Sequence, residues 1–341
     1  MFWILSWNLP VNEREVQVEK KSLDKLPVLY LIAPCYNEEQ VLPLTYKLFT
    51  DKLEQLVGEG KISEKSRVLF VNDGSSDSTW AIIRQLAVQH KRIEGISLSR
   101  NRGHQNALLA GLMEAKDLCD VTITLDCDGQ HDINAVDLML EKYREGNEVV
   151  YGIRNSRAGD SLFKKTFSEL YYKLINALGG EVITNHADYR LVSSKVLNVF
   201  ADYKEVNIFL RGLFPLVGFK STTINYDQFE RAAGKSHYSL SKMLTLAIDG
   251  ITSLSIKPIR IITGIGVLVA FISFIGVIYS FVTFFAGNTV PGWASMTSTI
   301  CFVSGIQLIS LGVIGEYVGK TYMETKQRPR YIISERTFSK E

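Results

Sequence analysis

Three short segments of the chain carry carboxylate and amide side chains where predicted strands end. The clearest reads DCDGQHD and begins at the end of the strand predicted for residues 121–126. In an extended chain, its alternate residues Asp126, Asp128 and Gln130 turn their oxygen atoms toward one side. Oxygen ligands at this spacing suit Mg²⁺ or Mn²⁺ bound together with a diphosphate. Taken alone, the pattern is equally typical of a turn that closes a strand.

The two other segments strengthen the metal-site interpretation. NDGSSDS ends the strand predicted for residues 67–73, and Asp73 could accept a hydrogen bond from a base or a ribose at the tight turn that follows. APCYNEEQ ends the strand predicted for residues 28–34, although NEEQ is equally a good helix start. Ligands of open parallel sheets bind beyond the carboxyl ends of the strands. The sequence therefore predicts one nucleotide site, to which the first strand end contributes Pro34, Tyr36, Asn37 and Glu38.

The elements that position these residues alternate between strands and helices. Strands are predicted for five β-branched runs, at 28–34, 67–73, 93–99, 121–126 and 148–153. Their near-continuous apolar character predicts burial on both faces. Between them, apolar residues at three- and four-residue spacing predict helices, so right-handed crossovers should join a largely parallel sheet. Two further short strands are expected at 187–193 and 220–226.

Two apolar runs near the C-terminus, residues 259–287 and 296–319, are long enough to cross a membrane. A hydrocarbon core of about 30 Å needs roughly 20 helical residues. Buried core helices are the alternative, but the first run has no charge from residue 261 to 290. The connecting loop is uncharged, while basic residues flank the outer ends: Lys257, Arg260, Lys320, Lys326, Arg328 and Arg330. Basic residues next to membrane spans are concentrated on the cytoplasmic side, which predicts that both ends of the pair and the α/β domain are cytoplasmic.

Composition excludes several classes of protein and site. The chain has 38 basic and 36 acidic residues and a net charge of +2, so no overall field favours nucleic acid. The four cysteines form no CxxC pair, which argues against a zinc site or a disulfide framework and fits a reduced, cytoplasmic setting. His104, His131, His186 and His237 show no metal-binding spacing, and none is assigned as a ligand. The N-terminal MFWILSW lacks a basic leader and a cleavage site, which argues against a signal peptide.

The order and spacing of PCYNEE, VNDGSSDST, SRNRGHQNALLAGL and DCDGQHD resemble glycosyltransferase family 2, whose GT-A fold binds nucleotide-sugars. The two apolar runs and the tail ISLGVIGEYVGKTYMETKQRPRYII are similar to the polyisoprenyl-phosphate glycosyltransferases of that family, which include bactoprenol glucosyltransferases and dolichol-phosphate mannose synthases. The similarity covers nearly everything after about residue 26. It implies Mg²⁺ or Mn²⁺ on Asp126, Asp128 and Gln130, and nucleotide contacts from Pro34, Tyr36, Glu38 and Asp73.

Basic residues after the fifth predicted strand could bind the phosphate of an acceptor, because arginine binds phosphate through two parallel hydrogen bonds. They are Arg154, Arg157, Lys164 and Lys165, with Ser168 nearby. A basic face toward anionic headgroups is the alternative, and both can hold because a lipid acceptor would arrive from that surface. The resemblance implies lipid-phosphate contacts from Arg154, Lys164 and Ser168.

Two later segments also match the family. NHADYRLVS resembles its segment near the sugar, which implies catalytic roles for Asp188 and Arg190 beside Asp128; a simple ion pair between the first two is the alternative. FERAAGKSHYSLSKM resembles a loop that closes over the diphosphate, with Arg231, Lys235, Ser236 and Tyr238. An acceptor phosphate is mostly dianionic at neutral pH and needs little help from a base. We therefore expect Asp188 to position the sugar or to stabilise positive charge on it.

The predicted architecture is an α/β, Rossmann-like GT-A domain followed by interfacial amphipathic helices and two transmembrane helices. The ranges are an N-terminal arm at 1–25, the cytoplasmic domain at 26–235, interfacial helices at 236–257, the transmembrane pair at 258–320 and a cytoplasmic tail at 321–341. An ordinary surface helix is the alternative to the interfacial helices.

The resemblance implies an activity and its partners. It implies inverting transfer of glucose or N-acetylglucosamine from a UDP-sugar to undecaprenyl phosphate at the inner membrane, by a homo-oligomer, for modification of cell-envelope glycans. A processive polysaccharide synthase is one alternative, but the sequence has no QxxRW motif and too few apolar spans. A membrane-tethered nucleotide-binding scaffold without transferase activity is the other.

Overall fold

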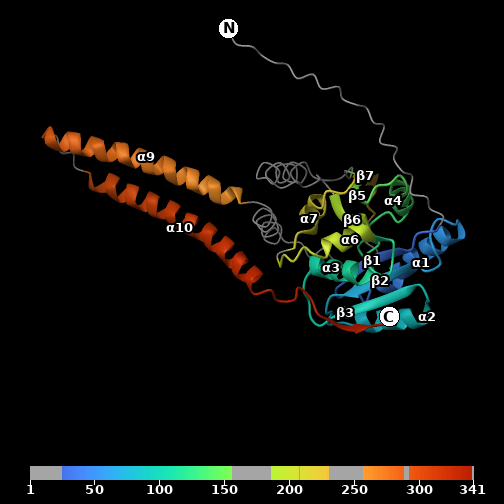
Figure 1. The fold of residues 1–341 in the computed structure, drawn as a ribbon. Coiled ribbons are helices and arrows are strands. Elements are labelled where there is room, and N and C mark those ends of the chain that lie inside the picture. Colours follow the sequence, from blue (N-terminus) through green and yellow to red (C-terminus); the bar gives the residue numbers. More distant parts are fainter. Residues whose placement is uncertain (1–24, 156–185, 207, 230–255, 288–291, 340–341) are drawn as a thin grey trace, which may run out of the picture.

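The computed structural model describes residues 25–155, 186–206, 208–229, 256–287 and 292–339 (Figure 1). Most of the predicted N-terminal arm and of the interfacial helices lies outside these ranges. So do seven predicted site residues: Arg157, Lys164, Ser168, Arg231, Lys235, Ser236 and Tyr238. Their roles stay predictions.

One sheet of eight strands, in the order β7-β5-β6-β4-β1-β2-β3-β8, forms the centre of the α/β domain. The strands are β1 (Leu29–Cys35), β2 (Arg67–Asn72), β3 (Ile93–Leu98), β4 (Val121–Thr124), β5 (Val149–Arg154), β6 (His186–Ser193), β7 (Ser221–Tyr226) and β8 (Ile333–Arg336). Strands β1 to β4 pair in parallel, while β6 and β8 are antiparallel to their neighbours. The predicted strands and the mostly parallel sheet are confirmed.

Helices cover both faces of this sheet. They are α1 (Leu42–Gly58), α2 (Thr79–Gln89), α3 (His104–Ala115), α4 (Ala135–Arg144), α6 (Ser194–Phe200) and α7 (Leu210–Leu216). Alternate residues of β1 enter two separate apolar cores, one shared with α1, α2 and α4 and the other with α3, α6 and α7. Burial on both faces explains why β1 has no polar alternation.

Helix α3 lies very close to the sheet because its centre has no side chain. A Cβ atom on Gly111 would lie 2.4 Å from Ile32 Cγ2 and 2.8 Å from Val71 Cγ2, closer than side chains can pack. The close approach fixes α3 against β1 and β2, and with it the residues at the N-terminus of α3.

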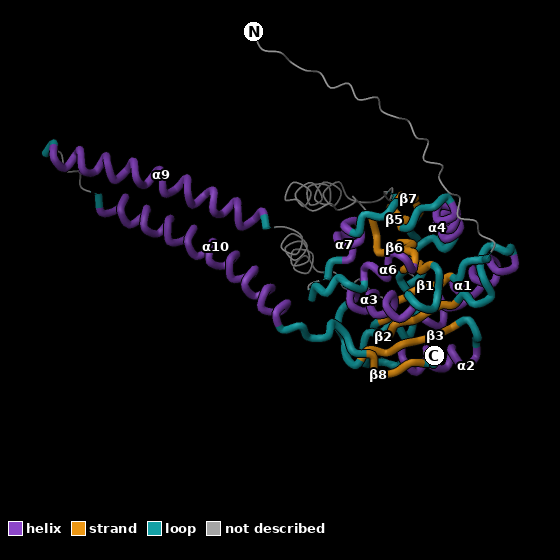
Figure 2. Tube along the Cα trace, in the orientation of Figure 1, coloured by secondary structure: helices purple, strands orange, loops and turns teal. Residues whose placement is uncertain are grey.

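Two long helices extend from the domain as a hairpin (Figure 2). They are α9 (Lys257–Phe285) and α10 (Trp293–Thr325), and both contain a stretch long and apolar enough to cross a membrane. Large apolar side chains point outward along both; Phe271, for example, is 63% exposed. A soluble protein would bury such a surface, so the hairpin requires an apolar environment.

After α10 the chain returns to the domain and adds β8 to the free edge of β3, as Figure 2 shows. The Ser99 amide donates to Ile332 O at 2.9 Å, and Gly95 exchanges hydrogen bonds with Thr337 of 2.8 and 3.0 Å. We call residues 329–339 the C-terminal strap. Tyr331, Ile333 and Phe338 of the strap pack against the core on the α3 side. Residues 321–341 are predicted as a separate cytoplasmic tail, whereas the structure places β8, which lies within this range, in the central sheet.

An ion pair on the strap should contribute to the stability of the domain. Arg336 donates to the buried Glu114 of α3 at 2.7 and 3.1 Å. Arg336→Ala leaves that carboxylate without its guanidinium partner and should cost about 1 to 2 kcal/mol, the lower part of the range for charged hydrogen bonds because Arg336 is partly exposed. The measurement is the thermal unfolding midpoint of the detergent-solubilised protein.

Arg84→Ala is the matched control. Its guanidinium lies 3.7 Å from Glu335 on the same strap, but both side chains are more than half exposed. Such surface pairs contribute less than about 0.5 kcal/mol. Equal midpoints for the two variants would mean that the Arg336 contact does not hold the strap.

Candidate active site

The loops after β1 and β2 are joined to each other at the carboxyl edge of the sheet. Asn37, whose φ is +55°, accepts a hydrogen bond from the Ser76 amide at 2.9 Å, and its own amide donates to Ser75 Oγ at 3.0 Å. The Glu38 amide donates to Thr79 Oγ1 at 2.8 Å. The Asn37 side chain therefore organises the two loops, while Tyr36 is 48% exposed beside them.

Asp73 organises a third loop. Its buried carboxylate accepts hydrogen bonds from the amides of Arg102 and Gly103 at 2.7 and 2.9 Å. Burial raises the pKa of Asp73, although these two hydrogen bonds oppose the shift. Gly74 has a φ of +62°, and a Cβ there would lie 2.3 Å from Arg100 C. Residues 100–103 thus lie directly against the end of β2, which places the N-terminus of α3; a nucleotide contact of Asp73 stays a prediction.

The predicted metal ligands share the loop after β4. Asp126 is 38% exposed, whereas Asp128 is buried and accepts a hydrogen bond from the Gln130 amide at 3.0 Å. The side-chain oxygen of Gln130 accepts from Gln228 Nε2 at 3.1 Å, so this oxygen already has a protein partner. Within the described ranges, no group of three or more His, Cys, Asp or Glu residues could hold a metal ion. Two carboxylates nevertheless fit Mg²⁺ or Mn²⁺, which commonly takes its other ligands from phosphates and water.

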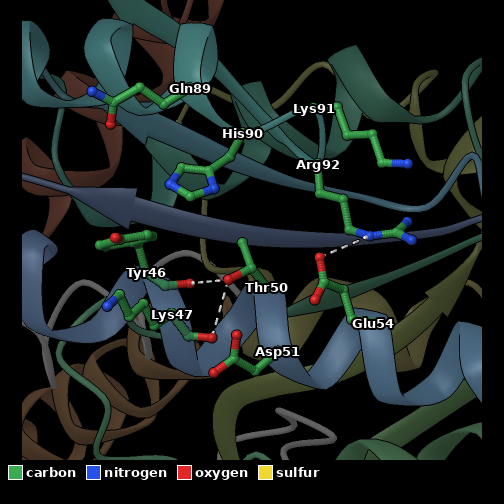
Figure 3. A pocket seen from close by; sticks show the side chains of 9 residues that line it. All are labelled: Tyr46, Lys47, Thr50, Asp51, Glu54, Gln89, His90, Lys91 and Arg92. Carbon is green, nitrogen blue, oxygen red and sulfur yellow. Dashed lines mark hydrogen bonds and ion pairs between the residues drawn. The ribbon is translucent and has the colours of Figure 1, made fainter.

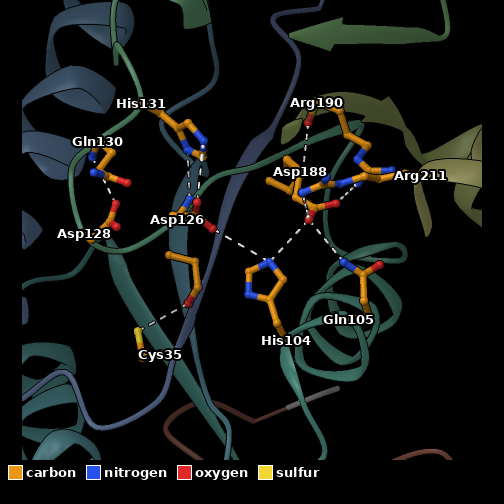
Figure 4. A network of polar contacts seen from close by, with 12 residues as sticks. Cys35, His104, Gln105, Asp126, Asp128, Gln130, His131, Asp188, Arg190 and Arg211 are labelled. Atoms are coloured by element: carbon orange, nitrogen blue, oxygen red, sulfur yellow. Dashed lines mark hydrogen bonds and ion pairs between the residues drawn. The ribbon is translucent and has the colours of Figure 1, made fainter. Parts of the chain in front are cut away.

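Asp188 lies on β6 at the centre of a network of donors (Figure 4). One oxygen pairs with Arg190; the other accepts from Arg211 Nη2 at 2.9 Å and from Gln105 Nε2 at 3.1 Å. His104 Nε2 is 3.6 Å from the same oxygen. Burial alone would raise the pKa of Asp188, but the charge of Arg211, the hydrogen bond with His104 and the charge of Arg190 hold it well below its usual range.

An ionised carboxylate with this many donors is a poor proton acceptor. The geometry therefore suits Asp188 for positioning, and not for removing a proton.

Arg190 lies beneath the site. It is fully buried, its Nη1 donates to Leu210 O at 3.1 Å, and its guanidinium lies 5.0 Å from the centroid of the Phe214 ring. Burial lowers the pKa of Arg190, and Asp188 opposes that shift. Arg190 thus holds one oxygen of Asp188 through the ion pair, and its hydrogen bond to Leu210 O connects β6 to α7.

His104 joins the two halves of the site. Its Nε2 lies 3.8 Å from Asp126 Oδ1 and 3.6 Å from Asp188 Oδ2, and Figure 4 shows it between them. A single side chain thus separates the predicted metal loop from the predicted sugar position. The segment SRNRGHQNALLAGL, which contains His104 and Gln105, predicts no role for either residue, and no motif includes Arg211.

His131 also holds the predicted metal loop, which is the loop after β4 that carries Asp126 and Asp128. The Asp126 amide donates to His131 Nδ1 at 3.1 Å, and the His131 ring stacks on Tyr189 with centroids 4.7 Å apart. Burial lowers the pKa of His131. This neutral ring holds the loop in place.

Arg154, the one predicted acceptor residue within the described ranges, ends β5 opposite Tyr226 of β7 and is exposed. Burial raises the pKa of Tyr226, and the nearby Arg154 guanidinium opposes this shift. It also acts on His131, although burial is the larger cause of the lowered pKa there. The Tyr226 ring lies 5.5 Å from the His131 ring, centroid to centroid, so Arg154 is near the loop that carries Asp126 and Asp128.

A separate cavity of about 460 Å³ opens between α1 and the start of β3 (Figure 3). Acidic and basic side chains are mixed in its wall, which includes Asp51, Glu54, Lys91 and Arg92. The start of β3 is at the amino edge of the parallel strands. This cavity is thus at the opposite edge from the site described above.

Comparisons with known proteins agree with this geometry. The chain matches the glycosyl transferase family 2 model over residues 30–200 and a GtrB C-terminal hairpin model over residues 257–321. The uncharacterized glycosyltransferase YkoT of Bacillus subtilis is 45% identical, with 90% of this chain and 91% of that protein aligned. The bactoprenol glucosyl transferase of Shigella phage SfX is 38% identical, with 90% and 98% aligned.

Among solved structures, a glucosyl-3-phosphoglycerate synthase from Mycobacterium tuberculosis is similar to 67% of this chain and 78% of its own, at 16% identity and a TM-score of 0.44. The family match spans all the strands from β1 to β6 and their connecting loops, and the relatives align over nearly the whole chain. The chain is therefore a glycosyltransferase and belongs to glycosyltransferase family 2.

Proposed function

We propose that the protein transfers glucose or N-acetylglucosamine from a UDP-sugar to undecaprenyl phosphate at the cytoplasmic face of the membrane. The observation that carries this proposal is the place of His104, within 4 Å of both Asp126 and Asp188. A diphosphate at Asp126 and a sugar at Asp188 would then be neighbours, as the two parts of one nucleotide-sugar must be. The name of the Shigella phage relative, bactoprenol glucosyl transferase, supports the lipid acceptor.

The chemistry follows from the charges around the two carboxylates. Mg²⁺ or Mn²⁺ held by Asp126 and Asp128 would neutralise the departing diphosphate. The ionised Asp188 faces positive charge developing on the sugar and fixes a sugar hydroxyl. The lipid phosphate is mostly dianionic at neutral pH, so it attacks the anomeric carbon without a base as the bond to UDP breaks.

Inversion at the anomeric carbon follows if this displacement is a single step. Both oxygens of Asp188 already accept hydrogen bonds, from Arg190 on one side and from Arg211 and Gln105 on the other. A carboxylate so engaged is poorly suited to form a covalent bond to the sugar. The arrangement favours direct attack by the phosphate oxygen over a glycosyl-enzyme intermediate.

The return of the chain to β8 supports the proposed topology. The strands before the hairpin and the strand after it belong to one sheet. If α9 and α10 each cross the membrane once, both outer ends of the hairpin must lie on the side of the α/β domain. The basic residues at these ends favour the cytoplasm as that side.

The decisive experiment incubates the purified protein with undecaprenyl phosphate and a panel of nucleotide-sugars, and identifies the lipid product by mass. We expect a single hexosyl or N-acetylhexosaminyl phospholipid, formed only with a divalent cation. Asp128→Asn should lower kcat more than about 10-fold, because an amide binds a divalent cation more weakly than a carboxylate and even outer partners of a metal contribute this much.

Mn²⁺ binding by Asp128→Asn, measured by calorimetry with UDP present, should weaken in parallel. Metal-dependent binding of UDP without any lipid product would favour the scaffold alternative. Normal turnover by Asp128→Asn would move the metal site elsewhere.

The topology can be tested by labelling intact cells with an impermeant thiol reagent. Ser295→Cys, in the first turn of α10, should react from outside, while Lys326→Cys, just after α10, should react only after lysis. A Cys301→Ser chain is the background and the blank, because the other cysteines, Cys35, Cys119 and Cys127, are buried. Reversed labelling would contradict the cytoplasmic orientation.

Arg154→Ala should separate a lipid-phosphate site from a basic membrane surface. Loss of a charged contact of about 1.5 to 3 kcal/mol lowers kcat/KM by roughly 10- to 150-fold. The loss should appear in KM for the lipid, while UDP affinity stays normal. Arg154→Lys should recover only part of it, because an ammonium cannot bind phosphate through a planar fork.

Lys220→Ala is the control for Arg154, since Lys220 lies just before β7, at the far end of the same strand pair. It should behave like wild type. If Arg154→Ala and wild type saturate alike with lipid, Arg154 does not bind the acceptor.

A further inference from the structure

Gln105, the second residue of α3, contacts two other elements of the active site through its single amide group. Its Nε2 donates to Asp188 Oδ2 at 3.1 Å, and its Oε1 accepts from the Leu210 amide at 3.1 Å. A carboxamide can do both because it carries a donor and an acceptor on one carbon. Figure 4 shows its nitrogen directed at Asp188, from the side of α3.

The contact with Leu210 fixes the start of α7. Leu210 is the first residue of this helix, and its N-cap residue, Phe209, provides no side-chain hydrogen bond. The first amides of a helix have no partner within it. Gln105 thus supplies the missing acceptor, and the next residue along, Arg211, reaches the same oxygen of Asp188 at 2.9 Å.

The neutral charge of Gln105 matters as much as its geometry. Asp188 already faces the cations Arg190 and Arg211, and His104 Nε2 lies 3.6 Å from the oxygen that Arg211 contacts. A further cation would attract the carboxylate more strongly and weaken its interaction with positive charge on a substrate. A neutral donor orients the second oxygen without adding to that attraction.

We propose that Gln105 is a positioning residue for sugar transfer: it sets the orientation of the Asp188 carboxylate and the position of Arg211 together. This inference rests on the proposed function of the same site. The position of Gln105 is fixed by its own helix, because Asp73 binds the loop before α3 and Gly111 lets α3 pack closely on the sheet. Its effect should therefore appear in the rate of transfer and not in the binding of UDP.

Gln105→Glu and Gln105→Leu separate its two contacts. Glutamate keeps an acceptor for Leu210 but sets a carboxylate against Asp188, whereas leucine loses both contacts. We expect both variants to lower kcat by about 10- to 100-fold, since each disturbs a hydrogen bond to a charged group. KM for the nucleotide-sugar and the affinity for UDP should stay within about 3-fold, because no nucleotide contact changes.

The matched control is Gln55→Glu. Gln55 is an exposed residue of α1 that also donates to a carboxylate, Glu59 Oε1, at 2.7 Å. The same chemical change there should leave kcat unaltered, so a general effect of the substitution is excluded.

A double-mutant cycle distinguishes positioning from a general loss of structure. Arg211→Ala removes the arginine that donates to the same oxygen and leaves His104 in place, and Arg211 is partly exposed, so this variant should fold. The quantity compared is the factor by which Gln105→Leu lowers kcat. If Gln105 acts through Asp188 and Arg211, this factor should be at least about 3-fold smaller in the Arg211→Ala background than in wild type. Equal losses in the two backgrounds would overturn the proposal.

Two outcomes must be kept apart. If wild type forms no lipid-linked sugar, the proposed function fails, and the role of Gln105 fails with it. If wild type is active and Gln105→Glu has a normal kcat, only the role of Gln105 is overturned. A folded variant that no longer binds UDP would contradict the proposal. A variant without a thermal unfolding transition has lost its fold, and Gln105→Asn then replaces it: its shorter amide reaches neither partner, so a normal rate would again overturn the proposal.

Discussion

The buried ion pair of Asp188 with Arg190 is the contact on which the catalytic half of the domain depends. A charge is expensive to bury unless it is paired and hydrogen-bonded, and removing one partner of a buried pair typically costs about 3 to 5 kcal/mol. Here both partners belong to β6, and each has a further contact: Thr124 of β4 donates to the backbone oxygen of Asp188 at 2.5 Å, and the Arg190 side chain donates to the backbone of α7. The antiparallel insertion of β6 between β4 and β5 thus brings the carboxylate to the metal loop.

Much of the fold could be predicted because its signals are local. The buried strands β1 to β5 are short apolar runs, and the helices between them show a regular apolar spacing. The place of the loop with Asp126 and Asp128 after a strand was predictable for the same reason, since these residues are close in sequence; their binding of a metal stays a prediction. Each of these predictions needs no knowledge of which distant residues meet.

The parts that were missed depend on distant contacts. Gln105 and Arg211 belong to the site only because β6 sets Asp188 between α3 and α7, and neither has a motif of its own. The hydrogen bonds of Asp73 to the amides of residues 102 and 103 were missed because these amides carry no sequence signal, while its nucleotide contact stays a prediction. Strand β8 is four residues long and pairs with a strand more than two hundred residues earlier. The homo-oligomer and the seven candidates outside the described residues stay predictions.

The late position of β8 in the chain has a consequence for biosynthesis. Gly95 and Thr337, which bond to each other across the edge of the sheet, are 242 residues apart. At roughly 5 to 20 residues per second, a ribosome needs about 10 to 50 seconds to reach the second after the first. Throughout that time β3 is an open edge, the kind of surface that pairs with other chains. Both helices of the hairpin are synthesised before β8, so the nascent domain is protected from edge-to-edge aggregation only after both have left the ribosome.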